Sequence, residues 1–209
     1  KPVLPGNPAF VEVTDGRFAV QTPRYHATLS AEDGLVFRPL SYTAPAGSPG
    51  DAADAPPELQ VRLRRVARGE CELFDAASDV DAGAEEAVAD DEGVSFWRAT
   101  AFEERYQPRG DGVEQSFVLD QRPDGQGPLE FTCELSLRHL AVLPPRAHRR
   151  GGLSCVDSGG ALAVRYGQVV VRDSGPGGLV IEPELSADGR RITFAVPGEW
   201  LDAARYPVV

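Results

Sequence analysis

Short runs in which apolar and polar residues alternate recur along this chain. Residues 59–66 (LQVRLRRV) show the pattern most clearly. A period of two is typical of a β-strand with one buried face and one solvated face. Comparable runs cover residues 94–102, 112–119, 129–137, 161–166, 168–172, 179–185 and 191–196. The pattern predicts many short strands and leaves little room for long helices.

Gly and Pro punctuate these runs. The chain has 22 Gly and 18 Pro along its whole length, and both residues favour turns over helix interiors. Residues 28–30 and 35–37 flank a turn in which Gly34 can adopt a positive φ, so they predict a hairpin. We therefore expect an all-β fold, an antiparallel β-sandwich that is enlarged or doubled, in a single domain over residues 1–209.

Two segments lack the alternation and are expected to be mobile loops. Residues 45–57 are rich in Ala, Pro, Gly and Asp. Residues 75–92 are acidic and rich in Ala, and their central part, 82–89, is compatible with a short helix or with an unstructured tip. Small and polar composition of this kind supplies too few apolar side chains for a packed core.

The charge of the chain limits its partners. The formal net charge is -11, whereas phosphate binding needs a clustered excess of Lys and Arg. The basic cluster Arg146, Arg149 and Arg150 beside His148 lies between Pro and Gly residues and is interpreted as a solvated turn. The apolar runs are also far shorter than the roughly 20 residues that span a bilayer. We therefore expect neither a nucleic-acid partner nor a membrane span.

Two compositional features concern the compartment. The chain contains no Met, even at position 1, so we expect that a segment before Lys1 was removed, by signal cleavage on export or by proteolysis. The three cysteines, Cys71, Cys133 and Cys155, cannot all pair with one another. A disulfide between Cys133 and Cys155 is one expectation, and three buried thiols that act as small apolar residues are the other.

The C-terminal half carries a resemblance to a known family. Its distinctive segments are residues 102–106, 112–119, 179–185, 188–194, 199–201 and 204–209. The last of these, with Trp200-Leu201 followed by Tyr206-Pro207-Val208, resembles the ending of N-terminal β-domains in large exported bacterial repeat proteins, including those that precede RHS/YD-type arrays. In that family an Ile-Asp-Pro continuation commonly follows, which this chain lacks. The resemblance spans roughly residues 94–209, and it implies an extracellular or envelope scaffold without catalytic residues.

The residues of this ending also carry a structural expectation of their own. Trp200, Leu201 and Tyr206 follow Pro197-Gly198 and a predicted strand. A short helical turn there can fold back and close one end of the sandwich, with the aromatic side chains filling the core.

The sequence offers no assembled catalytic motif. A hydrolase triad needs a nucleophile and a base that meet, yet the chain has no G-x-S-x-G elbow. His26 and His139 lie in strand-like runs, and no H-E-x-x-H spacing is present. Glu103 and Glu104 are adjacent, so in a strand they point to opposite faces and cannot line one cleft. We therefore expect a protein that is not an enzyme.

An acidic stretch raises the question of a metal. Asp79 and Asp81, followed by Gly83, resemble the oxygen-rich start of a calcium loop. The glycine comes one place early, and Asp90 stands where an EF-hand has Glu. A solvated acidic loop is the preferred interpretation, calcium is the alternative, and no other cofactor is expected.

Two classes of function remain. The domain is expected to be a structural or interaction module that assembles with other polypeptides in a secreted, periplasmic or cell-surface setting. The alternative is a carbohydrate-binding module that presents Trp97, Tyr25 or Tyr42 to sugar rings. Exposure separates them, because sugar binding needs aromatic rings on a solvent surface, whereas assembly needs apolar surface that another polypeptide covers.

Overall fold

The structure is a computed structural model that describes residues 8–40, 56–77, 87–98, 102–143 and 151–209. The described chain is nearly all β, with antiparallel pairing throughout and one short helix, α1 (Gly198–Ala203). The predicted all-β, sandwich-like fold is therefore confirmed.

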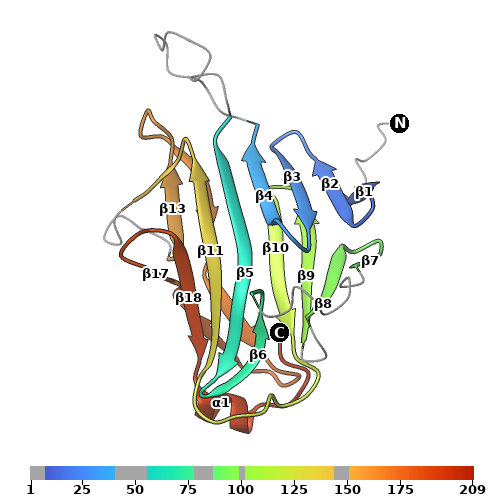
Figure 1. Ribbon diagram of the computed structural model, residues 1–209, viewed down its shortest axis with the longest axis vertical. Helices are drawn as coiled ribbons and strands as arrows, with labels where there is room; N and C mark the ends of the chain where they lie inside the picture. Colours follow the sequence, from blue (N-terminus) through green and yellow to red (C-terminus); the bar gives the residue numbers. More distant parts are fainter. Residues whose placement is uncertain (1–7, 41–55, 78–86, 99–101, 144–150) are drawn as a thin grey trace.

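A large sheet forms one layer of the molecule (Figure 1). It contains nine strands, and its long central strands β5 and β11 pair along almost their entire length. In spatial order the strands are β1 (Val11–Thr14), β2 (Arg17–Gln21), β3 (Tyr25–Ser30), β4 (Gly34–Pro39), β5 (Glu58–Arg68), β11 (Leu129–Arg138), β18 (Arg191–Val196) and β17 (Glu184–Leu185), with β6 (Cys71–Asp75) also paired to β5.

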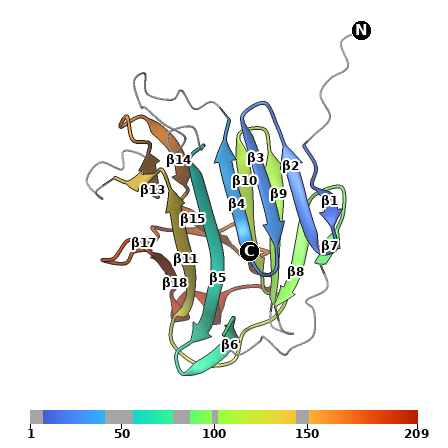
Figure 2. The same ribbon diagram turned by 45° about the horizontal axis from the view of Figure 1, so that its top comes forward.

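Three smaller sheets make up the opposing layer (Figure 2). A four-stranded sheet packs under the N-terminal half of the large sheet, and two short sheets pack under its C-terminal half. They are β10 (Gly112–Val118), β9 (Phe102–Arg109), β8 (Val94–Arg98) and β7 (Ala87–Ala89); then β12 (Ala141–Val142), β13 (Leu153–Val156) and β14 (Leu162–Tyr166); and then β15 (Val169–Arg172) with β16 (Gly178–Ile181).

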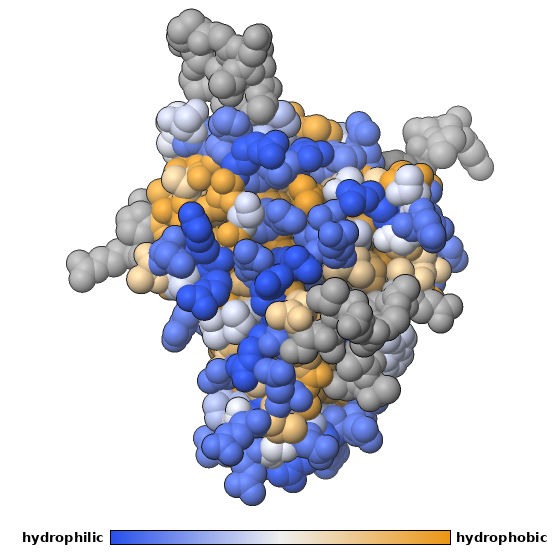
Figure 3. All heavy atoms as spheres, in the orientation of Figure 1, coloured by the Kyte–Doolittle hydropathy of each residue, from blue (hydrophilic) through white to orange (hydrophobic). Residues whose placement is uncertain are grey.

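The alternating apolar and polar residues of β5 and β11 give each strand one buried face and one polar face, as predicted. Leu59, Val61 and Leu63 face inward from β5, and Phe131 and Cys133 do so from β11. The intervening residues are mostly polar and lie on the other face, which in the view of Figure 3 is covered largely by hydrophilic side chains. Burial of one face of each strand is what holds the two layers together.

The interior consists of two hydrophobic clusters. One lies between β5, β11, β18 and the C-terminal sheets and includes Phe131, Phe194 and Leu201. The other lies between β2, β3, β4 and the four-stranded sheet and includes Tyr25 and Phe96. Phe37 packs against both clusters.

Several local predictions are confirmed. Gly34 has a φ of 67° in the hairpin that joins β3 and β4. The turn after Pro197-Gly198 is helix α1, whose Leu201 is fully buried and closes one end of the interior. Trp200 and Tyr206, which were expected to fill the core, are only partly buried and pack against it.

Other local predictions need correction. The run 179–185 is broken into β16 and β17 on either side of Pro183, because proline cannot donate to a strand ladder. Within the acidic segment 75–92, Asp75 ends strand β6, and residues 87–89 form strand β7 instead of the helix considered for 82–89. The remainder of that helix and most of the loop 45–57 lie outside the described residues. Strands β1 and β2, near the N-terminus, were not predicted.

Candidate functional site

A groove opens where the opposing layer is interrupted. β10 is the edge of the four-stranded sheet, and β14 and β15 are edges of the two short sheets. The space between these edges has a volume of about 770 Å³ and reaches down to the large sheet. It is the candidate site, and we refer to it below as the β10–β15 groove.

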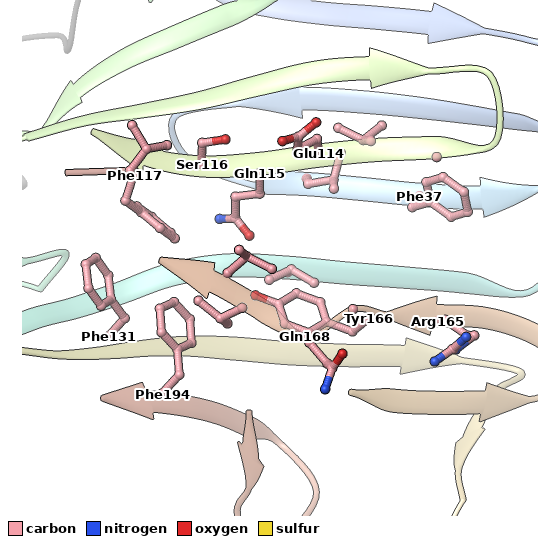
Figure 4. Close-up of a pocket in the computed structure, with 18 of the residues that line it drawn as sticks. Phe37, Glu114, Gln115, Ser116, Phe117, Phe131, Arg165, Tyr166, Gln168 and Phe194 are labelled. Atoms are coloured by element: carbon pink, nitrogen blue, oxygen red, sulfur yellow. The ribbon is translucent and has the colours of Figure 1, made fainter. Parts of the chain in front are cut away.

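The floor of the β10–β15 groove is aromatic and aliphatic. Phe131 and Phe194 stack with ring centroids 4.9 Å apart, and Phe117 lies 4.7 Å from Phe131. Figure 4 shows Phe117 and Gln115 pointing from β10 toward Tyr166, Phe131 and Phe194 across the space. The floor of the groove is therefore apolar, whereas its walls carry polar and charged side chains, among them Glu114, Arg165 and Gln168.

Three apolar side chains at the rim of the groove are exposed. Leu162 on β14 is 60% exposed, Val170 on β15 is 48% exposed, and Val209 is 46% exposed. Apolar exposure gathered along one groove is a feature of interaction surfaces, although Val11 and Val13 on β1 are exposed to a similar degree.

The two walls also offer backbone hydrogen-bonding groups. In an antiparallel ladder, alternate residues direct their N–H and C=O groups to the same neighbour. Leu119 uses these groups to bond Val208, so by alternation Val113, Gln115 and Phe117 direct theirs into the groove. Within the described chain, β10 has no further partner strand on this side.

The C-terminal residues already occupy one end of the groove, where Val208 forms an isolated antiparallel β-bridge with Leu119. Val208 exchanges two backbone hydrogen bonds with Leu119, both 2.9 Å long. Val209 exchanges two with Arg172 on the opposite wall, at 2.7 and 2.8 Å. Two residues thus bridge β10 and β15. The rest of the space between the walls extends from Val209 along β10 toward Gly112.

The residues that precede this bridge are held by hydrogen bonds to the turn after β15. The Ser174 N–H donates to the carbonyl of Arg205 at 2.9 Å, and the Arg205 N–H donates to the carboxylate of Asp173 at 3.0 Å. Backbone N–H donors, first that of Arg205 and then that of Gly175, lower the pKa of Asp173. The carboxylate is therefore charged at neutral pH and holds the C-terminal segment in place.

A buried polar network lies behind the β10 wall. Glu104 is fully buried and accepts hydrogen bonds from Arg98 at 2.6 Å, Tyr106 at 2.6 Å and Gln115 at 2.8 Å. Burial, and then the charge of Glu104, raise the pKa of Tyr106 well above its usual value. Because Gln115 also lines the groove, this network sets the position of a wall residue.

Trp97 lies on the other face of the four-stranded sheet and is 45% exposed. Its cross-strand partner is Glu103, which accepts a hydrogen bond from Arg105 at 2.9 Å and is bonded to Ser95. Glu103 and Glu104 therefore point to opposite faces, as predicted, although both are buried.

Tyr25 and Trp97, two of the aromatic residues predicted for sugar binding, do not share one exposed surface. Tyr25 is fully buried, so its predicted exposure is wrong: its ring stacks on Phe37 at 4.9 Å and its hydroxyl donates to the carbonyl of Arg109 at 2.7 Å. Trp97 is exposed, and Tyr42 lies outside the described residues. Of Tyr25 and Trp97, the two that lie in the described ranges, Trp97 alone has an exposed ring.

The predicted metal positions cannot be located, because Asp79 and Asp81 lie outside the described residues. No group of three or more His, Cys, Asp or Glu side chains in the described ranges is arranged to hold a metal ion. Nor does any helix in those ranges have the length and apolarity to cross a membrane.

The cysteines are free thiols, so the expected Cys133–Cys155 bond is not formed in this structure. Cys133 lies on β11 of the large sheet and Cys155 on β13 of a different sheet, and both are buried in the same cluster. Burial raises the pKa of Cys155 to about 11 and that of Cys133 further. Cys133 and Cys155 are packed here as small apolar side chains, in line with the other expectation, whereas Cys71 is only partly buried.

The histidines also differ from expectation in part. His26 is on strand β3 as predicted, and burial, together with the charge of Arg38, lowers its pKa. His139 follows the end of β11 and has a positive φ of 54°, so it is not a strand residue.

The β10–β15 groove itself was not predicted. It is formed by strands that are distant in sequence and do not pair with each other, and strand periodicity says nothing about which edges remain open. Residues 113–119 and 162–171 lie in or overlap segments predicted as strands, but nothing in their sequence shows which of these strands remain edges.

Comparisons with known proteins supply no relative. A scan against protein-family models, a search of curated proteins and a search of solved structures each found no match to this chain.

Proposed function

We propose that this domain is a non-catalytic interaction module that binds an extended segment of another polypeptide in the β10–β15 groove. The observation that carries the proposal is the pair of strand edges flanking an apolar floor. A strand inserted there gains main-chain hydrogen bonds from both walls and buries alternate side chains against the aromatic floor.

The net charge and the sequence resemblance are compatible with this role. A charge of -11 disfavours nucleic acid as the partner. The resemblance of residues 94–209 to exported β-domains implies a secreted, periplasmic or cell-surface setting, where such domains assemble with other chains. We propose that setting for this protein.

A synthetic peptide of about six residues with alternating Val and Thr, the usual length of a strand, is the probe. Its binding is measured by calorimetry against the wild type and Val170→Pro. By the alternation described above, the Val170 N–H faces the groove and takes no part in the β15–β16 ladder. Proline at an edge removes that donor without breaking the sheet. We expect binding about tenfold weaker, equivalent to roughly 1.4 kcal/mol.

Val180→Pro is the matched control. Val180 is the cross-strand partner of Val170, is similarly exposed at 57%, and directs its N–H to the opposite edge of the same hairpin. We expect Val180→Pro to bind the peptide as the wild type does. Equal losses in both variants, or no binding to the wild type, would contradict the proposal.

A second candidate is carbohydrate binding at Trp97. Its half-exposed ring beside the Glu103 carboxylate and the Arg105 guanidinium is the combination that sugar sites use, an aromatic face with polar groups at its edge. Glycan-array binding that is lost in Trp97→Ala and retained in Val170→Pro would favour this role over peptide binding.

A further inference from the structure

The hydrogen bonds of Val208 and Val209 define how a strand must lie in the groove. Val208 pairs with Leu119 and Val209 with Arg172, each through two mutual backbone bonds. Mutual bonds between the same two residues occur only in antiparallel pairs. The C-terminal segment is therefore antiparallel to β10 and to β15 at once, and the two walls run in the same direction.

Resting on the proposed function, we infer that the partner segment runs antiparallel to both walls, with its N-terminal end next to Val209 and its C-terminal end near Gly112. A parallel segment would place its hydrogen bonds in a different, slanted pattern, out of phase with the bridge already present. The strand that the groove accepts is thus collinear with Val208 and Val209.

The same bridge fixes the register. Moving along the groove from Val209, the next backbone groups on the β10 wall belong to Phe117, then Gln115, then Val113. On the β15 wall the next belong to Val170, and then to Gln168 at the turn before the strand. A strand in this position alternates between the two walls, and each of its residues bonds one of them.

Side-chain chemistry follows from this register. Val208 is buried, and so is Leu119 opposite it, whereas Val209 and Arg172 are exposed. Cross-strand partners point to the same face of a sheet. Residues of the partner that pair with Phe117, Gln115 and Val113 therefore point to the aromatic floor and must be apolar. Residues that pair with Val170 and Gln168 face solvent, beside Glu114 and Ser116, and are polar.

The direction of the bound strand is tested with the same Val-Thr peptide, which carries a nitroxide at its N-terminal or its C-terminal end. Paramagnetic broadening is read on the backbone amide signals of β10 in the intact chain. An N-terminal label is expected to broaden the signals of Phe117 and Val118, and a C-terminal label those of Gly112 and Val113. The opposite pattern would overturn the inferred direction while leaving peptide binding in the groove intact.

The side-chain pattern is tested with a peptide in which Lys replaces every Val. We expect its affinity to fall at least about tenfold, because charged groups would be placed on the aromatic floor. Equal affinity of the two peptides would overturn the inferred pattern. If neither peptide binds, the proposed function itself fails.

A third experiment tests whether the strand in the groove comes from another chain or from a segment joined to Val209. The Val-Thr segment is appended directly after Val209, and protection of the β10 amides from hydrogen exchange is compared with that given by the free peptide. Protection by the appended segment together with binding of the free peptide supports a partner chain as the source. Protection by the appended segment alone, at any concentration of free peptide, would show a strand supplied in cis and overturn the partner.

Discussion

The guanidinium of Arg98 lies 2.6 Å from a carboxylate oxygen of Glu104 in the interior between the two layers. Both side chains are buried, and the guanidinium also lies over the rings of Phe74 and Phe96 at 5.4 and 5.2 Å. A buried ion pair is costly to break, since the remaining charge is left without a counter-charge in a medium that solvates it poorly.

Glu104→Gln should therefore destabilise the protein. We expect a loss of about 3 kcal/mol in the free energy of unfolding, measured by urea denaturation. Glu114→Gln is the control, because its pair with Arg109 is about half exposed on both sides and is expected to contribute less than about 1 kcal/mol. Similar losses in the two variants would show that burial of the Arg98–Glu104 pair does not determine its contribution to the free energy of unfolding.

Arg68, the last residue of β5, forms an ion pair with Asp202 of helix α1. Its guanidinium is fully buried, donates to the carbonyls of Pro123 at 2.9 Å and Gly127 at 3.2 Å, and is paired with Asp202. Arg68→Met should lower the free energy of unfolding by about 3 kcal/mol, because buried carbonyls lose their donor. Arg122→Met removes a more exposed pair with the same Asp202 and should cost less than about 1 kcal/mol in the same urea titration.

Gly34 and Gly16 form a matched pair of turn glycines, with φ values of 67° and 66°. A Cβ on Gly34 would lie 2.3 Å from the carbonyl oxygen of Val61, whereas a Cβ on Gly16 meets nothing within 4 Å. Gly16→Ala should cost about 1 kcal/mol for the left-handed backbone alone. Gly34→Ala should cost clearly more, because the backbones of β4 and β5 must separate. Thermal unfolding of both variants measures the difference, and equal midpoints would contradict the close approach.

The free thiols lead to a prediction about pH. Burial raises the pKa of Cys155 from 9.0 to about 11, so the folded state keeps the proton at a pH where the unfolded chain has lost it. The stability from this group is complete below pH 9.0 and is lost as the pH rises toward about 11. Urea titrations at rising pH should show this decline, and Cys155→Ala should reduce it.

Alkylation tests the same arrangement of thiols directly. Iodoacetamide at about pH 8 should modify Cys71, which is partly exposed, and leave Cys133 and Cys155 unmodified until denaturant is added. Mass spectrometry of native and unfolded protein gives the number of alkylated cysteines in each state. If Cys133 and Cys155 resist alkylation even in denaturant and react only after reduction, the two form a disulfide in solution.

Local sequence patterns predicted the strands well and the candidate site poorly. β5, β11 and β18 were predictable because their alternation reflects one buried and one solvated face. Tyr25 was misjudged because its ring stacks on Phe37 and its hydroxyl bonds the carbonyl of Arg109, 84 residues away, and no local pattern shows these contacts. The groove depends on which edges stay unpaired after folding, and that information lies in contacts between strands, not within any one of them.

The division of the interior bears on how the molecule opens. Phe37 of β4 packs against both hydrophobic clusters, and β9 contributes Phe102 to one cluster and Tyr106 to the other, so β4 and β9 join the packing of the two halves of the interior. Strands β2 and β3 belong to one half and β18 to the other. Amide exchange under native conditions should then show two blocks with separate opening free energies, with the weaker half unfolding while the other stays closed.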